Sequence, residues 1–209
     1  MKKLSYSKFL WNSVDAHGVH SPFVYDIVAR GLNTRSVRIP KDYNNEKPVL
    51  NKKATDILCR LMIYFRAEKV YVLGDESGEV TETIRRCGEH IKNKVWFFSP
   101  LAPIPGVINM AYISPSDKNE VNTTIEKLLP NMGNNSFCIL ANIHTSENSE
   151  KLWEAVKQDP HVSVTIDTYH LGILFIRKGQ AKEHFTVRTT NSKFLDFIIG
   201  ARKLWGLLY

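Results

Sequence analysis

A short glycine turn is the stretch of this sequence best suited to hold a ligand. Residues 70–73 are an apolar run typical of a buried parallel strand, and Gly74 and Gly78 bound the turn that follows. From Glu79 onward, apolar residues recur at helical spacing. Strand, glycine turn and helix in this order form the nucleotide-binding corner of doubly wound α/β folds, where glycines admit a ligand close to the backbone. The spacing G-x-x-x-G, rather than G-x-G-x-x-G, makes the motif weakly specific.

The rest of the chain alternates between helical and extended patterns, which predicts an α/β fold with a largely parallel sheet. Helices are expected at 4–14, between Ser21 and Gly31, at 48–66, from 79, at 117–129, and from 146 or 149 to 158. Strands are expected at 70–73, 94–98, 107–113, 136–141, 162–166 and 172–176, with 185–187 as a candidate edge strand. The polar stretch 33–47 is expected to be a surface loop.

Residues 99–106 form an unusually short link between two expected strands. The link contains Pro100, Pro103 and Pro105, so it cannot be a helix. A parallel crossover normally takes a dozen or more residues. Extended, this link reaches about 26 Å. A return of about 17 Å together with a step of about 10 Å across one neighbouring strand is feasible for this link but tight. We expect that an element usually found here is missing.

Length and charge place the chain among globular proteins. Its 209 residues suit one sizeable domain, and a hydrophobic content of 43% permits a full core. The net charge is 28 − 21 = +7. An anionic partner is compatible with that charge, but the basic residues are spread out, so simple solubility is the favoured interpretation.

Cysteine and histidine usage argues against a metal site. Cys59, Cys87 and Cys138 each lie in an apolar segment without a CxxC motif, so we expect buried free thiols in a reducing cytoplasm. His17 and His20 lie close together but have no third ligand type nearby, which favours turn and capping roles. No apolar run approaches the roughly 20 residues that span a bilayer, so a cytoplasmic protein is expected.

The sequence predicts one domain with a helical segment at each end. We predict a domain over 1–190 that includes a helical lead-in at 1–47, followed by a C-terminal amphipathic helix at 191–209. This helix could dock on its own domain, form a homodimer contact or lie at a membrane interface, and the membrane surface is the least favoured of the three.

Two long runs resemble a known family. WNSVDAHGVHSPFVYDIVARGL (11–32) is similar to the N-terminal segment of bacterial class I S-adenosylmethionine-dependent methyltransferase-like proteins, which are O-methyltransferase-like. The run from 151 to 188 is similar to the C-terminal half of the same family's domain. The resemblance implies a three-layer, doubly wound, Rossmann-like sheet whose last strand is antiparallel. About six strands are expected here, because the resemblance also implies that one helix and one strand are deleted at the short link.

The resemblance also implies where S-adenosylmethionine would bind. The corresponding cofactor positions are Gly74, Asp75, Ser77, Gly78, Ser99 and Asn142. Ser99 stands where the family usually has an acidic residue that binds the ribose hydroxyls. A neutral hydroxyl makes hydrogen bonds about half as strong as those of a carboxylate. Cofactor binding is therefore expected to be weakened.

The family's metal site is largely absent from this sequence. Members close to catechol-type O-methyltransferases hold a divalent metal between an Asp and an Asp-Asn pair. The resemblance places Ser114 and Ala141-Asn142 at these positions, so only Asn142 remains. Hard divalent cations prefer several carboxylate oxygens. No metal is expected.

Two functions remain open at this stage. The leading hypothesis is a degenerate methyltransferase-like domain that binds an unknown small molecule or protein. The alternative is an active metal-independent small-molecule methyltransferase, with His144 or His170 as weak candidates for a general base. Neither histidine is paired with a carboxylate in the sequence, so an ordinary loop role is favoured for both. Nucleic-acid binding has only the net charge in its support.

Overall fold

The computed structural model describes residues 5–33, 50–99, 104, 106–114 and 118–189. The expected C-terminal helix at 191–209, nearly all of the loop at 33–47 and most of the link at 99–106 lie outside these ranges. Within them, no helix is long and apolar enough to cross a membrane.

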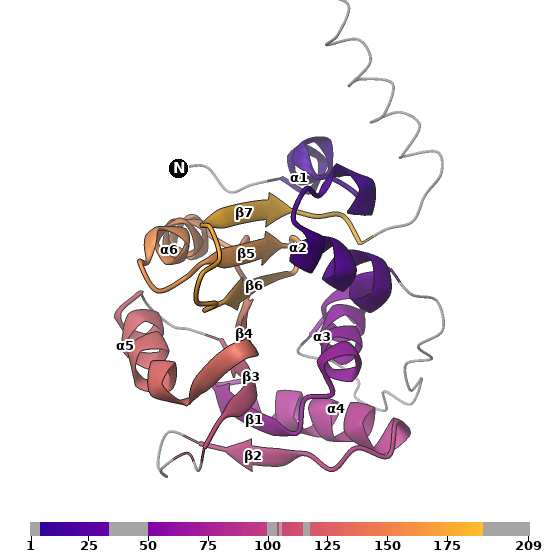
Figure 1. Ribbon diagram of the computed structural model, residues 1–209, viewed down its shortest axis with the longest axis vertical. Helices are drawn as coiled ribbons and strands as arrows, with labels where there is room; N and C mark the ends of the chain where they lie inside the picture. The colour runs from indigo at the N-terminus through magenta and orange to yellow at the C-terminus, as the bar shows by residue number, and fades with distance from the viewer. Residues whose placement is uncertain (1–4, 34–49, 100–103, 105, 115–117, 190–209) are drawn as a thin grey trace, which may run out of the picture.

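A seven-stranded sheet forms the middle layer of the fold, in the order β2-β1-β3-β4-β6-β5-β7 (Figure 1). The strands are β1 (Lys69–Leu73), β2 (Trp96–Phe98), β3 (Ile108–Ile113), β4 (Met132–Ala141), β5 (Val164–Asp167), β6 (Leu171–Phe175) and β7 (Glu183–Thr186). Among the described strands, β6 alone is antiparallel to its neighbours, β4 and β5. The predicted fold class, an α/β fold with a mostly parallel sheet, is confirmed. Seven strands form where about six were expected, because the candidate edge strand pairs with β5 in parallel as β7, so the antiparallel strand is the sixth and not the last.

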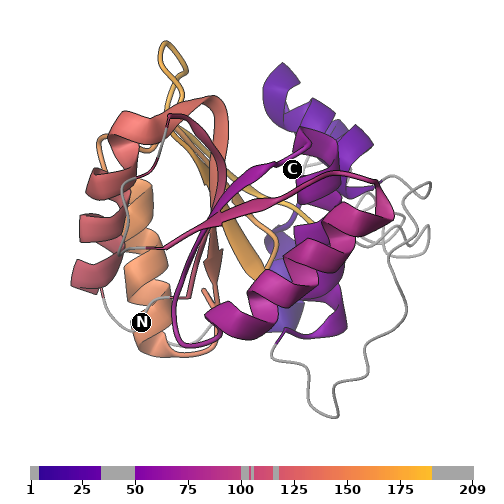
Figure 2. The same cartoon turned by 90° about the horizontal axis from the view of Figure 1, so that it is seen from below.

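Helices cover both faces of this sheet (Figure 2). They are α1 (Tyr6–Asn12), α2 (Pro22–Asp26), α3 (Lys52–Phe65), α4 (Ser77–His90), α5 (Lys118–Leu128) and α6 (Glu147–Gln158). A π-helical segment, η2 (Ile27–Leu32), continues α2. One core lies between the sheet and α2, η2, α3 and α4, and a second lies between the sheet and α5 and α6.

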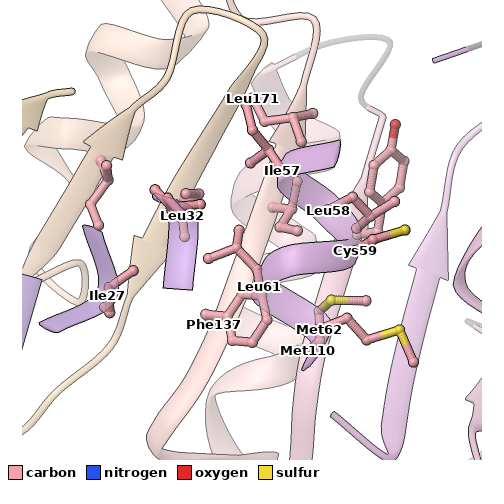
Figure 3. Packing of buried hydrophobic residues seen from close by; sticks show 14 of the residues in the cluster. Ile27, Leu32, Ile57, Leu58, Cys59, Leu61, Met62, Met110, Phe137 and Leu171 are labelled. Carbon is pink, nitrogen blue, oxygen red and sulfur yellow. The ribbon is translucent and has the colours of Figure 1, made fainter. Parts of the chain in front are cut away.

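Helix α3 illustrates how the apolar periodicity of the sequence predicted the core on its side of the sheet. Its residues at helical spacing are buried against the sheet, as expected. In Figure 3, Leu61 of α3 lies beside Phe137 of β4. Met62 lies beside Met110 of β3. Because such side chains leave water completely, each contributes on the order of 1.5–3 kcal/mol to folding.

The sequence placed some helix ends incorrectly. Helix α3 begins at Lys52 rather than at Pro48, because the side chain of Asn51 accepts the backbone N–H of Ala54 and caps the helix. Gly31 was expected to end the second helix, but it lies inside η2, whose C-cap is Asn33. The expected Ser146 cap of α6 is confirmed by its hydrogen bond from the N–H of Ser149.

Strands β2 and β3 lie where the length of the link at 99–106 allows them to lie. Strands β2 and β3 flank β1 on opposite sides, and both pair with it in parallel. The link therefore steps over one strand, as the reach argument required. In sequence order the chain thus passes from β1 outward to β2 and back across to β3. Such a reversal is the topological switch point at which open α/β sheets bind ligands.

Two of the three cysteines contradict the expectation of free thiols. Cys59 of α3 and Cys87 of α4 form a disulfide, with Cα atoms 5.7 Å apart. Cys138 is free and buried. The sequence analysis missed the pair because the two cysteines are 28 residues apart and only helix packing brings them together. Disulfides are rare in reducing compartments, so the bond removes one support of the cytoplasmic assignment.

The lead-in residues attach the start of the domain to its last strand. Val14 forms a parallel bridge with Val187, just after β7. Arg188 is buried, donates to the carbonyl of Ser13 and pairs with Asp15 at 3.0 Å. Helix α1 is thereby held near the carboxyl end of β7 (Figure 1).

Candidate functional site

The carboxyl ends of β2, β1, β3 and β4 lie side by side along one edge of the sheet, because these strands are parallel. The predicted cofactor residues follow these ends: Gly74, Asp75, Ser77 and Gly78 after β1, Ser99 after β2, and Asn142 after β4. Neighbouring strands lie about 4.8 Å apart, so Ser99 and Asn142 are separated by about 14 Å. We call residues 74–78 the glycine corner.

Gly74 serves close strand packing in the glycine corner. Its φ is +122°, a conformation that side chains rarely adopt. A Cβ atom at this position would lie 2.5 Å from the carbonyl oxygen of Ser114 and 2.7 Å from the Cβ of Ser114. The N–H of Ser114 also donates to the carbonyl of Leu73 at 2.9 Å. The close approach of Ser114 at the end of β3 therefore requires a glycine at position 74.

Glu76 joins the glycine corner to β3. Its carboxylate accepts the hydroxyl of Ser114 at 3.3 Å and the hydroxyl of Tyr112 at 3.4 Å. Tyr112 is fully buried. Burial, with the charge and hydrogen bond of Glu76, raises the pKa of Tyr112 above its ordinary value, so the phenol stays protonated and donates. Side chains of the protein itself therefore occupy the space between the ends of β1 and β3.

The rest of the glycine corner is accessible. Asp75 and Gly78 are exposed, and a Cβ atom on Gly78 would meet no heavy atom within 4 Å. Ser77 is the first residue of α4, and its N–H donates to the carbonyl of Gly74 at 3.1 Å. The first turn of α4 is thus open to solvent at Gly78.

The two remaining predicted positions, Ser99 and Asn142, are both exposed. Asn142 has a φ of +58°, and its carbonyl accepts the N–H and the hydroxyl of Thr145. No group of three or more His, Cys, Asp or Glu side chains suited to a metal ion occurs in the described part of the chain.

A buried polar cluster lies further along the same edge, beyond β4. His144 Nε2 contacts Asp167 Oδ2 at 2.8 Å, and His144 Nδ1 contacts Glu150 Oε1 at 3.2 Å. All three side chains are buried, with 4–7% of each residue exposed. We call these three residues the His144 cluster. Both ring nitrogens already face a carboxylate, so the ring has no open nitrogen with which to take a proton from a substrate.

The environment of the His144 cluster favours a charged imidazolium. Burial lowers the pKa of His144, but the hydrogen bonds and charges of Asp167 and Glu150 raise it by more, so the net shift is upward from 6.5. The ring of Tyr169 stacks on His144 with centroids 5.3 Å apart. Phe9 of α1 packs on the same imidazole at 6.5 Å. The cluster therefore lies beneath α1.

His170 lies beside the His144 cluster in a different environment. Its Nδ1 contacts the side-chain amide of Asn51 at 3.1 Å, whereas Nε2 is buried without a hydrogen-bond partner. Burial, together with the charge of Lys53, lowers the pKa of His170. The ring is therefore neutral near neutral pH. Its role as a base remains a prediction.

Sequence reasoning missed Glu76, Glu150 and Asp167. Glu76 lies inside the glycine turn, but its partners follow it by 36 and 38 residues. Asp167 is 23 residues from His144, and only the parallel course of β4 and β5 brings their carboxyl ends together. Glu150 could have been noticed, because a helix that starts at Ser146 places position 150 one turn into the helix, close to the preceding loop.

Comparison with solved structures finds similarity to methyltransferases. A putative caffeoyl-CoA O-methyltransferase from Staphylococcus aureus aligns over 63% of this chain and 87% of its own, with 13% identity and a TM-score of 0.44. An SAH-bound methyltransferase from Podospora anserina aligns over 77% and 98%, with 8% identity and a TM-score of 0.46. An O-methyltransferase from Bacillus cereus in complex with SAH aligns over 66% and 84%, with 12% identity and a TM-score of 0.41.

No protein-family model and no curated protein sequence matches the chain. The identities and TM-scores of the structural matches are low. We therefore transfer no activity, substrate or cofactor from these proteins to this chain.

Proposed function

We propose that this protein is a methyltransferase-like domain that acts by binding a ligand or partner and does not catalyse efficient methyl transfer. The proposal rests on one observation, the occupied space between the ends of β1 and β3. Glu76 reaches across that space to Tyr112 and Ser114, and Gly74 packs directly on Ser114. A ligand that enters at the switch point must displace these contacts.

The exposed positions at the edge support the same function. Ser99 offers one neutral hydroxyl, and Asn142 faces solvent. A nucleoside bound there would gain a weaker hydrogen bond than a carboxylate provides. In the lead-in, His17 and His20 are both exposed, which makes residues 17–23 a candidate contact segment for a partner.

The first experiment is titration of the protein with S-adenosylmethionine and with S-adenosylhomocysteine by isothermal calorimetry. We expect dissociation constants weaker than about 100 µM, or about −5.5 kcal/mol. Tighter binding of either compound would contradict the proposal.

A second experiment tests whether Glu76 is the group that closes the corner. Glu76→Ala removes the carboxylate that contacts Tyr112 and Ser114. We expect its affinity for S-adenosylhomocysteine to rise at least about tenfold, or about 1.4 kcal/mol. Glu79→Ala is the matched control, because it removes the same charge from the first turn of α4 at an exposed position. An equal gain in both variants would assign the effect to net charge instead.

The alternative, an active metal-independent methyltransferase, has one observation in its favour. The space around Gly78 is open at the N-terminus of α4, where a doubly wound fold receives an anionic ligand group. This alternative predicts that Gly78→Val abolishes cofactor binding, because the side chain blocks close approach to the backbone. The leading proposal predicts dissociation constants weaker than about 100 µM in both proteins. Methyl transfer to any acceptor by the unmodified protein would favour the alternative.

A further inference from the structure

We propose that the His144 cluster is a pH-sensitive clasp, which holds α1 against the carboxyl edge of the sheet while His144 is protonated and loosens it when His144 loses its proton. The proposal concerns the part of the edge between β4 and β5, which lie two and four strand spacings from β1, about 10 and 19 Å. It does not depend on whether the glycine corner binds a cofactor.

The cluster joins three elements that are distant in sequence. His144 lies in the loop after β4, Glu150 lies in the first turn of α6, and Asp167 is the last residue of β5. Asp167 also accepts the N–H of Tyr169 at 2.8 Å, which fixes the turn that carries the stacked tyrosine. One imidazole ring thus ties the β4–α6 loop, α6 and the β5–β6 turn together.

Helix α1 rests on this cluster through aromatic side chains. Phe9 is 2% exposed and packs on both His144 and Tyr169. Tyr6 makes an edge contact with Tyr169, with ring centroids 4.8 Å apart. The surface that receives α1 therefore consists of the imidazole and the tyrosine that the carboxylates position.

The charges around the ring give the clasp its direction. With His144 protonated, each N–H donates to a carboxylate, and one positive charge lies between two negative charges. Without that proton, one ring nitrogen becomes an acceptor that faces a carboxylate, and two carboxylates remain buried beside a neutral ring. Buried charges without a counter-charge are strongly unfavourable. Loss of the proton should therefore separate the elements that meet at the ring.

The sign of the pH dependence follows from the raised pKa of His144. A group whose pKa is higher in the folded state stabilises that state fully below its unfolded value of 6.5. The stabilisation disappears as pH rises through the folded pKa. The contact of α1 should therefore weaken on the alkaline side of this range and hold on its acidic side.

Other titratable groups near the ring do not produce the same pH dependence. Tyr169 stacks on the imidazole from the β5–β6 turn, and His170 lies edge-on to Tyr169. From α1, Tyr6 accepts a hydrogen bond from Lys53 of α3 at 3.0 Å. The lowered pKa of His170 places its titration at lower pH than that of His144.

The test combines a proton titration with hydrogen exchange on the full chain. The His144 ring is followed by NMR, and exchange of the peptide over residues 5–15 is followed from about pH 6 to about pH 9. After correction for intrinsic exchange, we expect the opening constant of this peptide to rise by up to about tenfold per pH unit between the unfolded value of 6.5 and the folded pKa of His144, and to level off above that pKa. A constant that does not change while His144 titrates would overturn the proposal.

Variants separate the clasp from general alkaline effects. His144→Gln should remove the pH-dependent step, whereas His161→Gln, at an exposed histidine paired with Asp159, should keep it. Glu150→Gln provides a second route if His144→Gln does not fold. It removes one carboxylate that raises the pKa of His144, so the step should move to lower pH. A step that persists in His144→Gln, or that does not move in Glu150→Gln, would overturn the proposal.

Discussion

The glycine corner and the His144 cluster occupy the same edge of one sheet, yet they are built differently. In the corner, Glu76 contacts two neutral hydroxyls at 3.3 and 3.4 Å. In the cluster, an imidazole ring whose pKa is raised contacts two carboxylates at 2.8 and 3.2 Å, with all three groups buried. The corner is therefore closed by weak contacts, and the cluster is held by strong ones.

This difference assigns the two regions to different tasks. Long hydrogen bonds to hydroxyls contribute little and can rearrange when a ligand arrives. When one member of a buried group of charges is removed, the remaining charges are left without a partner, which is strongly unfavourable. The corner can therefore change its occupant, whereas the cluster changes only when its proton leaves. Four predictions test this contrast.

Removal of the ring should have the largest effect on stability. His144→Ala leaves Asp167 and Glu150 buried without their shared cation, and we expect the free energy of unfolding in urea to fall by about 3–5 kcal/mol. His161→Ala, at an exposed histidine, should change it by less than about 0.5 kcal/mol. A loss below about 1 kcal/mol in His144→Ala would remove the contrast between the two regions.

Reduction of the disulfide between α3 and α4 should come next. The bond closes a loop with a separation of 28 residues, and breaking it should cost about 3 kcal/mol. Urea unfolding with and without dithiothreitol measures this effect. The unfolded, unreduced chain should expose a single titratable thiol, that of Cys138. Three reactive thiols in that state would show that the bond does not form.

The two glycines of the corner should respond in opposite directions. Gly74→Ala forces a side chain into a φ of +122° and against the Ser114 carbonyl, and should cost about 2–3 kcal/mol. Gly78→Ala enters open space in the first turn of α4 and should stabilise by about 0.5–1 kcal/mol. Thermal unfolding distinguishes the two, and equal effects would mean that the close approach at Ser114 is wrong.

Loss of the Tyr112 hydroxyl should have the smallest effect. Its hydrogen bond to Glu76 is 3.4 Å long, so Tyr112→Phe should lower the free energy of unfolding by less than about 1 kcal/mol. Urea unfolding at neutral pH checks this value. A loss of 3 kcal/mol or more, on the order of that expected for His144→Ala, would make the corner as rigid as the cluster.

The sequence was sufficient for most of the fold because the signals were local. Continuous apolar runs located six of the strands, since the run at 70–73 and its equivalents reflect burial within a parallel sheet. The seventh strand, β7, was expected only as a candidate edge strand at 185–187. Helix boundaries were less certain. Pro48 looked like a start, but the side chain of Asn51 caps α3, and a local hydrogen bond of this kind outweighs a propensity.

The candidate site was predictable only in part. Gly74 was found from its place after a strand, but the reason for a glycine there lies in Ser114, forty residues away, which no local pattern links to it. The Cys59–Cys87 bond was missed for the same reason, because each cysteine also fits its apolar helix face. His144 was recognised as a candidate, but its partners were not.

The sequence by itself determined the order of helices and strands, the apolar faces, the short link over β1 and the existence of a glycine corner. These features follow from periodicity, chain reach and turn chemistry, which act over a few residues. The tertiary structure decided what the edge of the sheet contains. Glu76 closes the corner and His144 contacts two carboxylates because strand pairing places separate loops at one edge of the sheet. Where the surroundings are of low polarity, the energy of each charge depends strongly on the neighbouring charges.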